Sequence, residues 1–214
     1  MKFTAPDDNP ISERWRDLLL AEHLALKVLD VETEVFDFGG QRFLEIPRFD
    51  RVGPLGRKGL FSLRALEAEF VGRAREAWPV LVNELVKQGC VHPDAIAGTA
   101  RLWAFGMLIG NTDMHHGNLS FISAHGRPYH LAPAYDMLPM GFAPKSGGGM
   151  VNTLRPAMLL DAIAGEIWHE SLELAERFYA LVSDCNRFSA SFAPCVAALR
   201  AHLDEARPRI SRLG

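Results

Sequence analysis

The sequence has little cysteine, and its three cysteines form no CxxC pair. So few and so widely spaced cysteines argue against a disulfide framework and against a zinc site built on paired thiolates. We therefore expect three small buried side chains in a protein from a reducing compartment. They are Cys90, Cys185 and Cys195.

A long apolar run is also missing. No window approaches the roughly 18 apolar residues of a membrane-spanning helix. The first ten residues, MKFTAPDDNP, contain two acidic side chains and lack the apolar core of a signal peptide. These absences predict a soluble, cytoplasmic protein with no membrane partner.

The chain has no excess of one charge and no glycine-rich nucleotide motif. The net charge is −3, from 23 basic and 26 acidic residues. We therefore expect no direct nucleic-acid contact from this chain, since a basic face is typical of such contacts. Neither GxGxxG nor GxxxxGKS/T occurs, which argues against a dinucleotide fold and a P-loop.

Hydrophobic periodicity predicts strands early and again in mid-chain, while helices dominate the second half. A Gly-Gly turn favours a hairpin over residues 33–47, and a second hairpin is expected over 119–132 with its turn at 124–127. This segregation indicates an α+β fold, with a small β-containing part on a larger helical part. The expected helices cover residues 11–30, 63–78, 79–88 and 93–110, with three more after about residue 156, and loops are expected at 48–59 and 144–149.

The stretch IGNTDMHHGNLSF, residues 109–121, carries the strongest functional pattern. Asp113 and Asn118 are five residues apart in a loop after a helix, as are the catalytic Asp and the metal-binding Asn of protein kinases. Phosphoryl transfer needs a second carboxylate on the metal ions, and Asp136 follows the next expected hairpin. Oxygen ligands of this kind suit Mg²⁺.

Two other interpretations of these residues stay open. Asp and Asn are common turn and cap residues, so the stretch could be an ordinary polar turn. Alternatively, clustered His and Asp side chains could form the di-metal site of a phosphohydrolase. The four candidates for that site are Asp113, His115, His116 and Asp136.

Several segments in order resemble the HipA-like serine/threonine kinases, which are toxins of bacterial toxin–antitoxin pairs. LIGNTDMHHGNLSF is similar to the family motif IGxxDxHxKNxS, and YHLAPAYDMLP resembles the YxLxPxYDxxS element that follows it. RFLEIPRFDR resembles the family's hinge, RDLLLAEHLAL its first helix, and MKF the strand whose lysine meets the ATP phosphates. The resemblance covers most of the first 140 residues.

The resemblance implies a role for each matching residue of the catalytic loop and the next hairpin. Asp113 would be the catalytic Asp, and His115 beside it would contact phosphate. Asn118 and Asp136 would hold Mg²⁺. The implied cofactors are therefore ATP and Mg²⁺.

The same resemblance implies how the nucleotide is bound. Lys2 would pair with the α- and β-phosphates. The adenine would meet the carbonyl of Pro47 and the amide of Phe49, because proline lacks an N–H but keeps an acceptor C=O. The implied fold is kinase-like, with a truncated nucleotide lobe and hinge over residues 1–50 and a mainly helical lobe over 51–214.

The sequence departs from the family pattern at three places. Gly117 stands where the family has a lysine, so a cation that would stabilise the transferring phosphoryl group is missing. In the family, a Glu of the first helix pairs with the phosphate lysine. Arg14 aligns with that Glu, and Glu13 is next to it, so whether Glu13 replaces the family's Glu stays open. The chain begins almost at Lys2, without the family's phosphate loop. We therefore expect a fragment of a longer protein or a form that lacks half of its nucleotide lobe.

These patterns predict an ATP- and Mg²⁺-dependent kinase that acts on a Ser or Thr of an unidentified protein, with an antitoxin as a further partner. The competing class is a catalytically impaired kinase-like module or fragment that serves as a toxin–antitoxin or transcriptional regulatory partner. Gly117 and the missing phosphate loop favour the competing class.

Overall fold

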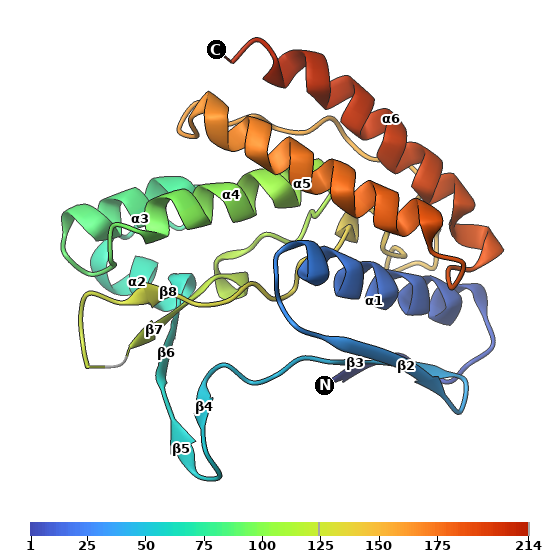
Figure 1. Ribbon diagram of the computed structural model, residues 1–214, viewed down its shortest axis with the longest axis horizontal. Coiled ribbons are helices and arrows are strands. Elements are labelled where there is room, and N and C mark those ends of the chain that lie inside the picture. Colours follow the sequence, from blue (N-terminus) through green and yellow to red (C-terminus); the bar gives the residue numbers. More distant parts are fainter. Residues whose placement is uncertain (124, 214) are drawn as a thin grey trace.

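A computed structural model of the chain describes residues 1–123 and 125–213. A small sheet lies beside helix α1, and the remaining helices form a larger body next to it (Figure 1). The α+β prediction is therefore confirmed. The helices are α1 (Pro10–Val28), α2 (Leu63–Phe70), α3 (Trp78–Lys87), α4 (Ala95–Leu108), α5 (Gly165–Asp184) and α6 (Ala193–Ile210), with 3-10 turns η1 (His116–Asn118), η2 (Met140–Phe142) and η3 (Ala190–Phe192). The strands are β1 (Lys2–Phe3), β2 (Glu34–Phe38), β3 (Gln41–Glu45), β4 (Arg51–Val52), β5 (Gly56–Arg57), β6 (Gly59–Ser62), β7 (Ser120–Ser123) and β8 (His130–Leu131).

The first sheet places the N-terminal lysine against α1. Its strands are antiparallel in the order β1-β3-β2, and Lys2 is opposite Leu44. Leu44 is fully buried, and side chains of paired residues share one face of a sheet. Helix α1 covers this face, and its N-cap residue is Asn9, whose side chain accepts a 2.9 Å hydrogen bond from the N–H of Ser12.

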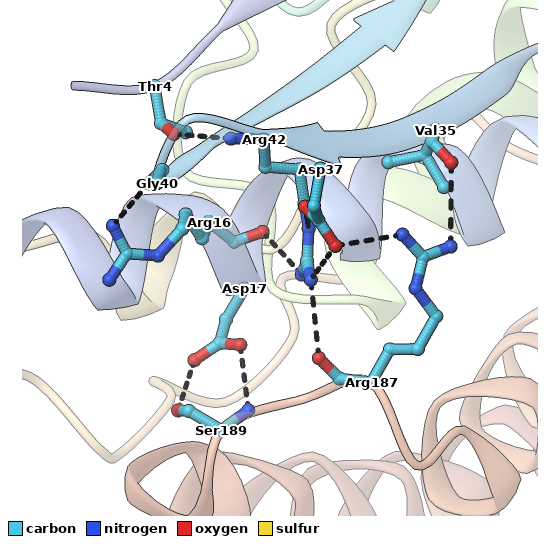
Figure 2. A network of polar contacts seen from close by, with 9 residues as sticks. All are labelled: Thr4, Arg16, Asp17, Val35, Asp37, Gly40, Arg42, Arg187 and Ser189. Carbon is cyan, nitrogen blue, oxygen red and sulfur yellow. Dashed lines mark hydrogen bonds and ion pairs between the residues drawn. The ribbon is translucent and has the colours of Figure 1, made fainter. Parts of the chain in front are cut away.

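A polar network fastens this sheet to the helical body (Figure 2). The Arg42 guanidinium on β3 donates to Asp37 at 2.7 Å and to the carbonyl of Arg16 on α1 at 3.2 Å. Arg187, in the segment after α5, donates to the same Asp37 carboxylate at 3.1 Å. The network joins segments about 150 residues apart, so the sheet and the helices hold each other in place.

Aromatic side chains fill the centre of the helical body. Trp78 of α3 meets Trp103 of α4 edge to face at a centroid distance of 5.6 Å, and Phe105 of α4 meets Phe178 of α5 at 6.2 Å. All four are buried. Edge-to-face pairs add to the stabilisation that burial provides, and α4 is thereby fixed against its neighbours just before the loop that carries Asp113.

The segment expected to be a loop over residues 48–59 contains strand pairs, so that prediction was wrong. Val52 of β4 is opposite Gly56 of β5, and Leu60 of β6 is opposite Ile122 of β7. Strands β4 and β5 form a two-stranded sheet of their own, and the other three-stranded sheet has the order β6-β7-β8. Local sequence does not reveal the pairing of β6, because its partner lies about 60 residues further along the chain.

Two helix predictions also need correction. The helix expected over residues 63–78 ends at Phe70, because Gly72 takes a φ of +71° and closes a turn on the carbonyl of Glu67. The three helices expected after residue 156 are two, α5 and α6, with the short turn η3 between them. The turn expected at 124–127 includes Ala124, which lies outside the described residues.

Candidate functional site

A cleft of about 660 Å³ lies between β1, α1 and the loops that follow α4 and β8. The N-terminal strand and two loops from mid-chain meet here. Strand β1 is at the edge of the first sheet, and the two loops follow α4 and β8 of the helical body. The predicted residues that line the cleft are Lys2, Asp113, His115, Asn118 and Asp136.

Lys2 is held between two carboxylates in this cleft. Its Nζ donates to Oε1 of Glu22 at 2.6 Å and also contacts the carboxylate of Asp136. Glu22 lies on α1 and is only 1% exposed in its side chain. Strand β1, helix α1 and the segment after β8 therefore meet at one ammonium group.

These contacts shift the protonation equilibria of the pair. Burial alone would lower the pKa of Lys2, but the carboxylates of Glu22 and Asp136 outweigh it and raise that pKa above its ordinary value. Burial raises the pKa of Glu22, and the Lys2 ammonium opposes this rise. Lys2 is consequently a charged ammonium at neutral pH, which suits a group that must meet an anion.

A buried amide connects the two loops of the cleft. Asn111 is 2% exposed, and its Oδ1 accepts a 3.0 Å hydrogen bond from the backbone N–H of Asp113. Its Nδ2 donates to the backbone carbonyl of Asp136 at 3.3 Å. Asp136 has a φ of +51°, a conformation that costs a non-glycine residue free energy and is often found at functional sites.

The orientation of Asn118 fits a metal ligand. Its Nδ2 donates to the backbone carbonyl of Asp113 at 2.9 Å, so Oδ1 is the side-chain atom that remains to bind a cation. Asp136 adds carboxylate oxygens in the same cleft. Protein sites for Mg²⁺ commonly use one or two such ligands and leave the other positions to water and phosphate. The donor set therefore fits this ion.

His115 has one defined tautomer when it is neutral. Its Nδ1 accepts a 3.0 Å hydrogen bond from the N–H of Gly117, so Nε2 carries the proton and can donate. A Cβ at position 117 would come within 2.9 Å of the His115 ring. The glycine that replaces the family's lysine is thus coupled to the position of this imidazole.

Tyr135 connects the segment of Asp136 to the loop that follows α4. Its hydroxyl donates to the carbonyl of Gly117 at 2.9 Å and shares a 2.6 Å hydrogen bond with Ser120. Phe49 packs against the Tyr135 ring with centroids 6.2 Å apart. The predicted hinge residue therefore contacts the residue that precedes Asp136.

The two residues predicted to bind adenine do not line the cleft in which the five other predicted site residues meet. Pro47 is exposed after β3, and Phe49 is half-buried against Tyr135. Neither belongs to the residues that line the cleft. Their proposed contact with adenine stays a prediction.

The structure answers the question that the alignment of Arg14 left open. Glu13 accepts a 2.5 Å hydrogen bond from Ser191, while the buried Arg14 guanidinium donates to the carbonyls of Phe142 and Val151. The partner of Lys2 is Glu22, which the sequence analysis missed. A carboxylate within the apolar run LLLAEHLAL was the available signal, because a buried acid needs a partner.

The di-metal alternative finds no geometric support. The Nε2 of His116 lies 2.9 Å from the carbonyl of Glu76, so this imidazole has a backbone partner. Within residues 1–123 and 125–213, no group of three or more His, Cys, Asp or Glu side chains is arranged to hold a metal. Cys90 and Cys195 are buried as expected, whereas Cys185 is only half-buried, and all three are free thiols.

Comparison with known proteins identifies the family. The sequence model of the HipA-like C-terminal domain matches residues 2–202. The chain belongs to this family. It is similar to Toxin YjjJ of Escherichia coli K12, with 34% identity over an alignment of 221 residues. The alignment covers all of this HipA-like chain and 49% of the toxin. The chain thus spans about half the length of this curated relative.

Solved structures support a kinase-like fold for the HipA-like chain. The HipA of Shewanella oneidensis MR-1, in a complex with HipB and operator DNA, superposes with a TM-score of 0.57 at 18% identity and covers 91% of this chain and 55% of that one. The proinflammatory kinase CtkA of Helicobacter pylori superposes with a TM-score of 0.55 at 12% identity, and the match covers 95% of this chain and 83% of CtkA. No helix among the described residues is long and apolar enough to cross a bilayer.

Proposed function

We propose that this HipA-like chain transfers the γ-phosphoryl group of ATP to a Ser or Thr hydroxyl of a protein, with Mg²⁺ as cofactor. The observation that carries the proposal is the meeting of Lys2, Asp113, Asn118 and Asp136 in one cleft. A cation, an exposed carboxylate and two oxygen ligands are the parts that phosphoryl transfer requires. Family membership and the kinase-like fold support the proposal.

The chemistry assigns a task to each group. The oxygen of the acceptor hydroxyl forms a bond to the γ-phosphorus, the bond from that phosphorus to the β–γ bridging oxygen breaks, and ADP leaves. Asp113 orients the hydroxyl and takes its proton. The Nε2–H of His115 donates to a phosphate oxygen. Such donors act by stabilising charge that develops in the transition state.

Mg²⁺, held by Oδ1 of Asn118 and the carboxylate of Asp136, would neutralise phosphate charge. Lys2 contacts Asp136 in the structure, so we propose that its ammonium leaves this carboxylate for the phosphates while it keeps Glu22. The chain of Pro47 and Phe49 would contact the adenine. Lys2 would then pair first with the carboxylate of Asp136 and later with the phosphates.

A protein antitoxin is the proposed partner. The HipA of Shewanella oneidensis was solved with HipB and operator DNA. By analogy, this chain would reach DNA through such a partner, because its own net charge is −3 and offers no general attraction to phosphate. The acceptor protein is unidentified.

A second candidate is a kinase-like module that binds its partner without transferring phosphate. Gly117 leaves the loop without the family's lysine, and Lys2 neutralises Asp136 in the structure. Both features would weaken the hold on a transferring phosphoryl group. A regulatory role inside a toxin–antitoxin complex would then remain.

Nucleotide binding and phosphate transfer, measured on the same preparation, separate the two candidates. Calorimetry with ATP, with and without Mg²⁺, tests binding, and radiolabelled ATP tests transfer to a mixed protein substrate. The kinase proposal expects Mg²⁺-dependent binding and transfer that Asp113→Asn abolishes, while the exposed control Asp161→Asn keeps both. A chain that binds no nucleotide at millimolar ATP would refute it and favour the module.

A further inference from the structure

The cleft around Lys2 has a polar and an apolar part along helix α1. Trp15, Leu19 and Glu22 line the cleft, and their spacing of four and three residues places them on one face of the helix. Glu22 belongs to the polar part, where its carboxylate accepts a 2.6 Å hydrogen bond from Lys2. Trp15 lies seven residues earlier, which corresponds to about 10 Å along the helix axis.

Trp15 supplies the exposed surface of the apolar part. It is 36% exposed, whereas Leu19 and Leu138 beside it are each 8% exposed. The half-buried Met140 also lines this part of the cleft. We call these four residues the apolar end of the cleft. A partly exposed indole next to aliphatic side chains offers contact area to a large apolar group.

The segment after β8 runs along α1 in the opposite direction. Pro133 lines a pocket together with Val28, at the C-terminal end of α1. The carbonyl of Phe142 accepts a 3.0 Å hydrogen bond from Arg14, near the N-terminal end of the same helix. The residues before Asp136 therefore lie toward the C-terminal end of α1, and those after it lie toward the N-terminal end.

The proposed adenine contact and the apolar end are on opposite sides of Asp136. Phe49 packs against Tyr135, immediately before Asp136, with ring centroids 6.2 Å apart. Met140 of the apolar end follows Asp136 in the chain. A nucleotide with its adenine at Phe49 and its phosphates at Lys2 would therefore leave the apolar end to another group.

In-line transfer fixes the direction from which the acceptor arrives. The attacking and the leaving oxygen lie on opposite sides of the γ-phosphorus. Because ADP leaves on the side of Phe49, the acceptor hydroxyl approaches from the side of the apolar end, where Asp113 also lines the cleft. The residues next to the hydroxyl in the acceptor chain are then the neighbours of Trp15.

We propose that the apolar end binds a large apolar side chain of the acceptor polypeptide, within three residues of the Ser or Thr that receives the phosphate. An extended chain advances about 3.3 Å per residue, so three residues cover the distance of about 10 Å between Glu22 and Trp15. Such a side chain would remove the exposed indole from water, which is favourable. The inference rests on the proposed kinase function and names the class of its acceptor.

The wild-type chain tests this preference without any mutation. Pools of nine-residue peptides with a central serine carry either leucine or alanine at one position, up to three residues from the serine, and are degenerate elsewhere. We expect kcat/KM to be at least about tenfold higher with leucine at one of these positions, since apolar contacts discriminate substrates by such factors. Equal values for leucine and alanine at every position would overturn the proposal.

A matched pair of variants tests the role of Trp15. Trp15 and Ile96 are both 36% exposed, and Ile96 lies on α4 outside the lining of the cleft. We expect Trp15→Ala to lose the leucine preference with an unchanged KM for ATP, whereas Ile96→Ala keeps the preference. Trp15→Phe retains an aromatic ring and should keep part of the preference, which guards against a loss through misfolding. A full leucine preference in Trp15→Ala would overturn the proposal.

Tryptophan fluorescence distinguishes the acceptor from the nucleotide as occupant of the apolar end. The other three tryptophans are buried, so quenching by acrylamide reports chiefly on Trp15; they are Trp78, Trp103 and Trp168. We expect the preferred leucine pool to reduce the quenching and Mg²⁺-ATP alone to leave it unchanged. Protection by Mg²⁺-ATP alone, with weaker ATP binding in Trp15→Ala, would place the adenine at the apolar end and overturn the proposal.

The kinase function and the acceptor preference fail in different ways. If ATP binds and phosphate is transferred without any leucine preference, the kinase function stands and the acceptor preference is overturned. If no nucleotide binds, the kinase function is wrong, and quenching then decides the rest. Protection of Trp15 by leucine pools but not by alanine pools would support peptide binding at the apolar end, and equal quenching with both would overturn it.

Discussion

The Nζ of Lys2 donates a 2.6 Å hydrogen bond to the buried carboxylate of Glu22. This contact fixes the N-terminal strand on helix α1 at the mouth of the proposed nucleotide cleft. Since Glu22 is almost fully buried, Lys2 is the cation that compensates its charge. Loss of Lys2 would leave the buried Glu22 carboxylate without its cation, whereas loss of Glu22 would leave Lys2 with Asp136 as its carboxylate partner.

Glu22→Gln tests whether this carboxylate positions Lys2. If the kinase proposal holds, we expect transfer to fall by about 10- to 100-fold, because second-layer groups that orient a functional side chain have effects of this size. Steady-state transfer assays measure it. Glu13→Gln is the control, because Glu13 lies on the same helix but contacts Ser191. Equal losses in the two variants would contradict a specific role for Glu22.

Asn111→Ala tests the amide that connects the two loops. The change leaves the N–H of Asp113 and the carbonyl of Asp136 without their side-chain partner, so we expect a loss of about 1–3 kcal/mol in the free energy of unfolding. Urea denaturation measures this loss, and a Mg²⁺ titration should show weaker binding. Thr112→Ala, at the exposed neighbouring position, should leave both quantities near wild type.

Tyr135→Phe removes one hydroxyl and keeps the ring against Phe49. The carbonyl of Gly117 and the hydroxyl of Ser120 each lose a hydrogen bond, and we expect about 0.5–1.5 kcal/mol less stability per bond. If Tyr135 positions Asp136, the Mg²⁺ concentration needed for half-maximal transfer should rise while the KM for acceptor stays constant. A loss of stability with an unchanged Mg²⁺ requirement would indicate a purely structural role.

Asp37 should make the stability depend on pH in the acid range. Its pKa lies below the ordinary value because the Arg42 guanidinium donates to the carboxylate, with Arg187 as a second donor. A lowered pKa contributes stability above the unfolded value of about 3.9, and this contribution is lost as the pH falls through the lower folded value.

The measurement compares urea midpoints of wild type and Asp37→Asn from pH 7 to pH 3. We expect the variant to be less stable at pH 7 and the gap to narrow below about pH 3.9. Asp161→Asn, exposed in the segment before α5, controls for the general effect of charge. A gap that stays constant down to pH 3 would contradict the role assigned to Asp37.

Several features followed from local sequence because they depend on neighbouring residues. The α+β class and most helix positions came from the spacing of apolar residues, and Asp113, Asn118 and Asp136 came from short motifs. The HipA-like resemblance was carried by the same motifs, and the family model later matched residues 2–202. Local hydrogen bonding also explains where prediction failed, since Gly72 ends α2 through a turn on Glu67.

Tertiary structure alone decided which distant groups meet. Glu22, rather than Glu13, reaches Lys2 because strand β1 pairs with β3 and crosses α1 at that level. Strand β6 pairs with β7, which lies about 60 residues further along the chain. The physical reason is that local propensity acts over a few residues, whereas hydrogen-bond partners and burial depend on how distant segments pack.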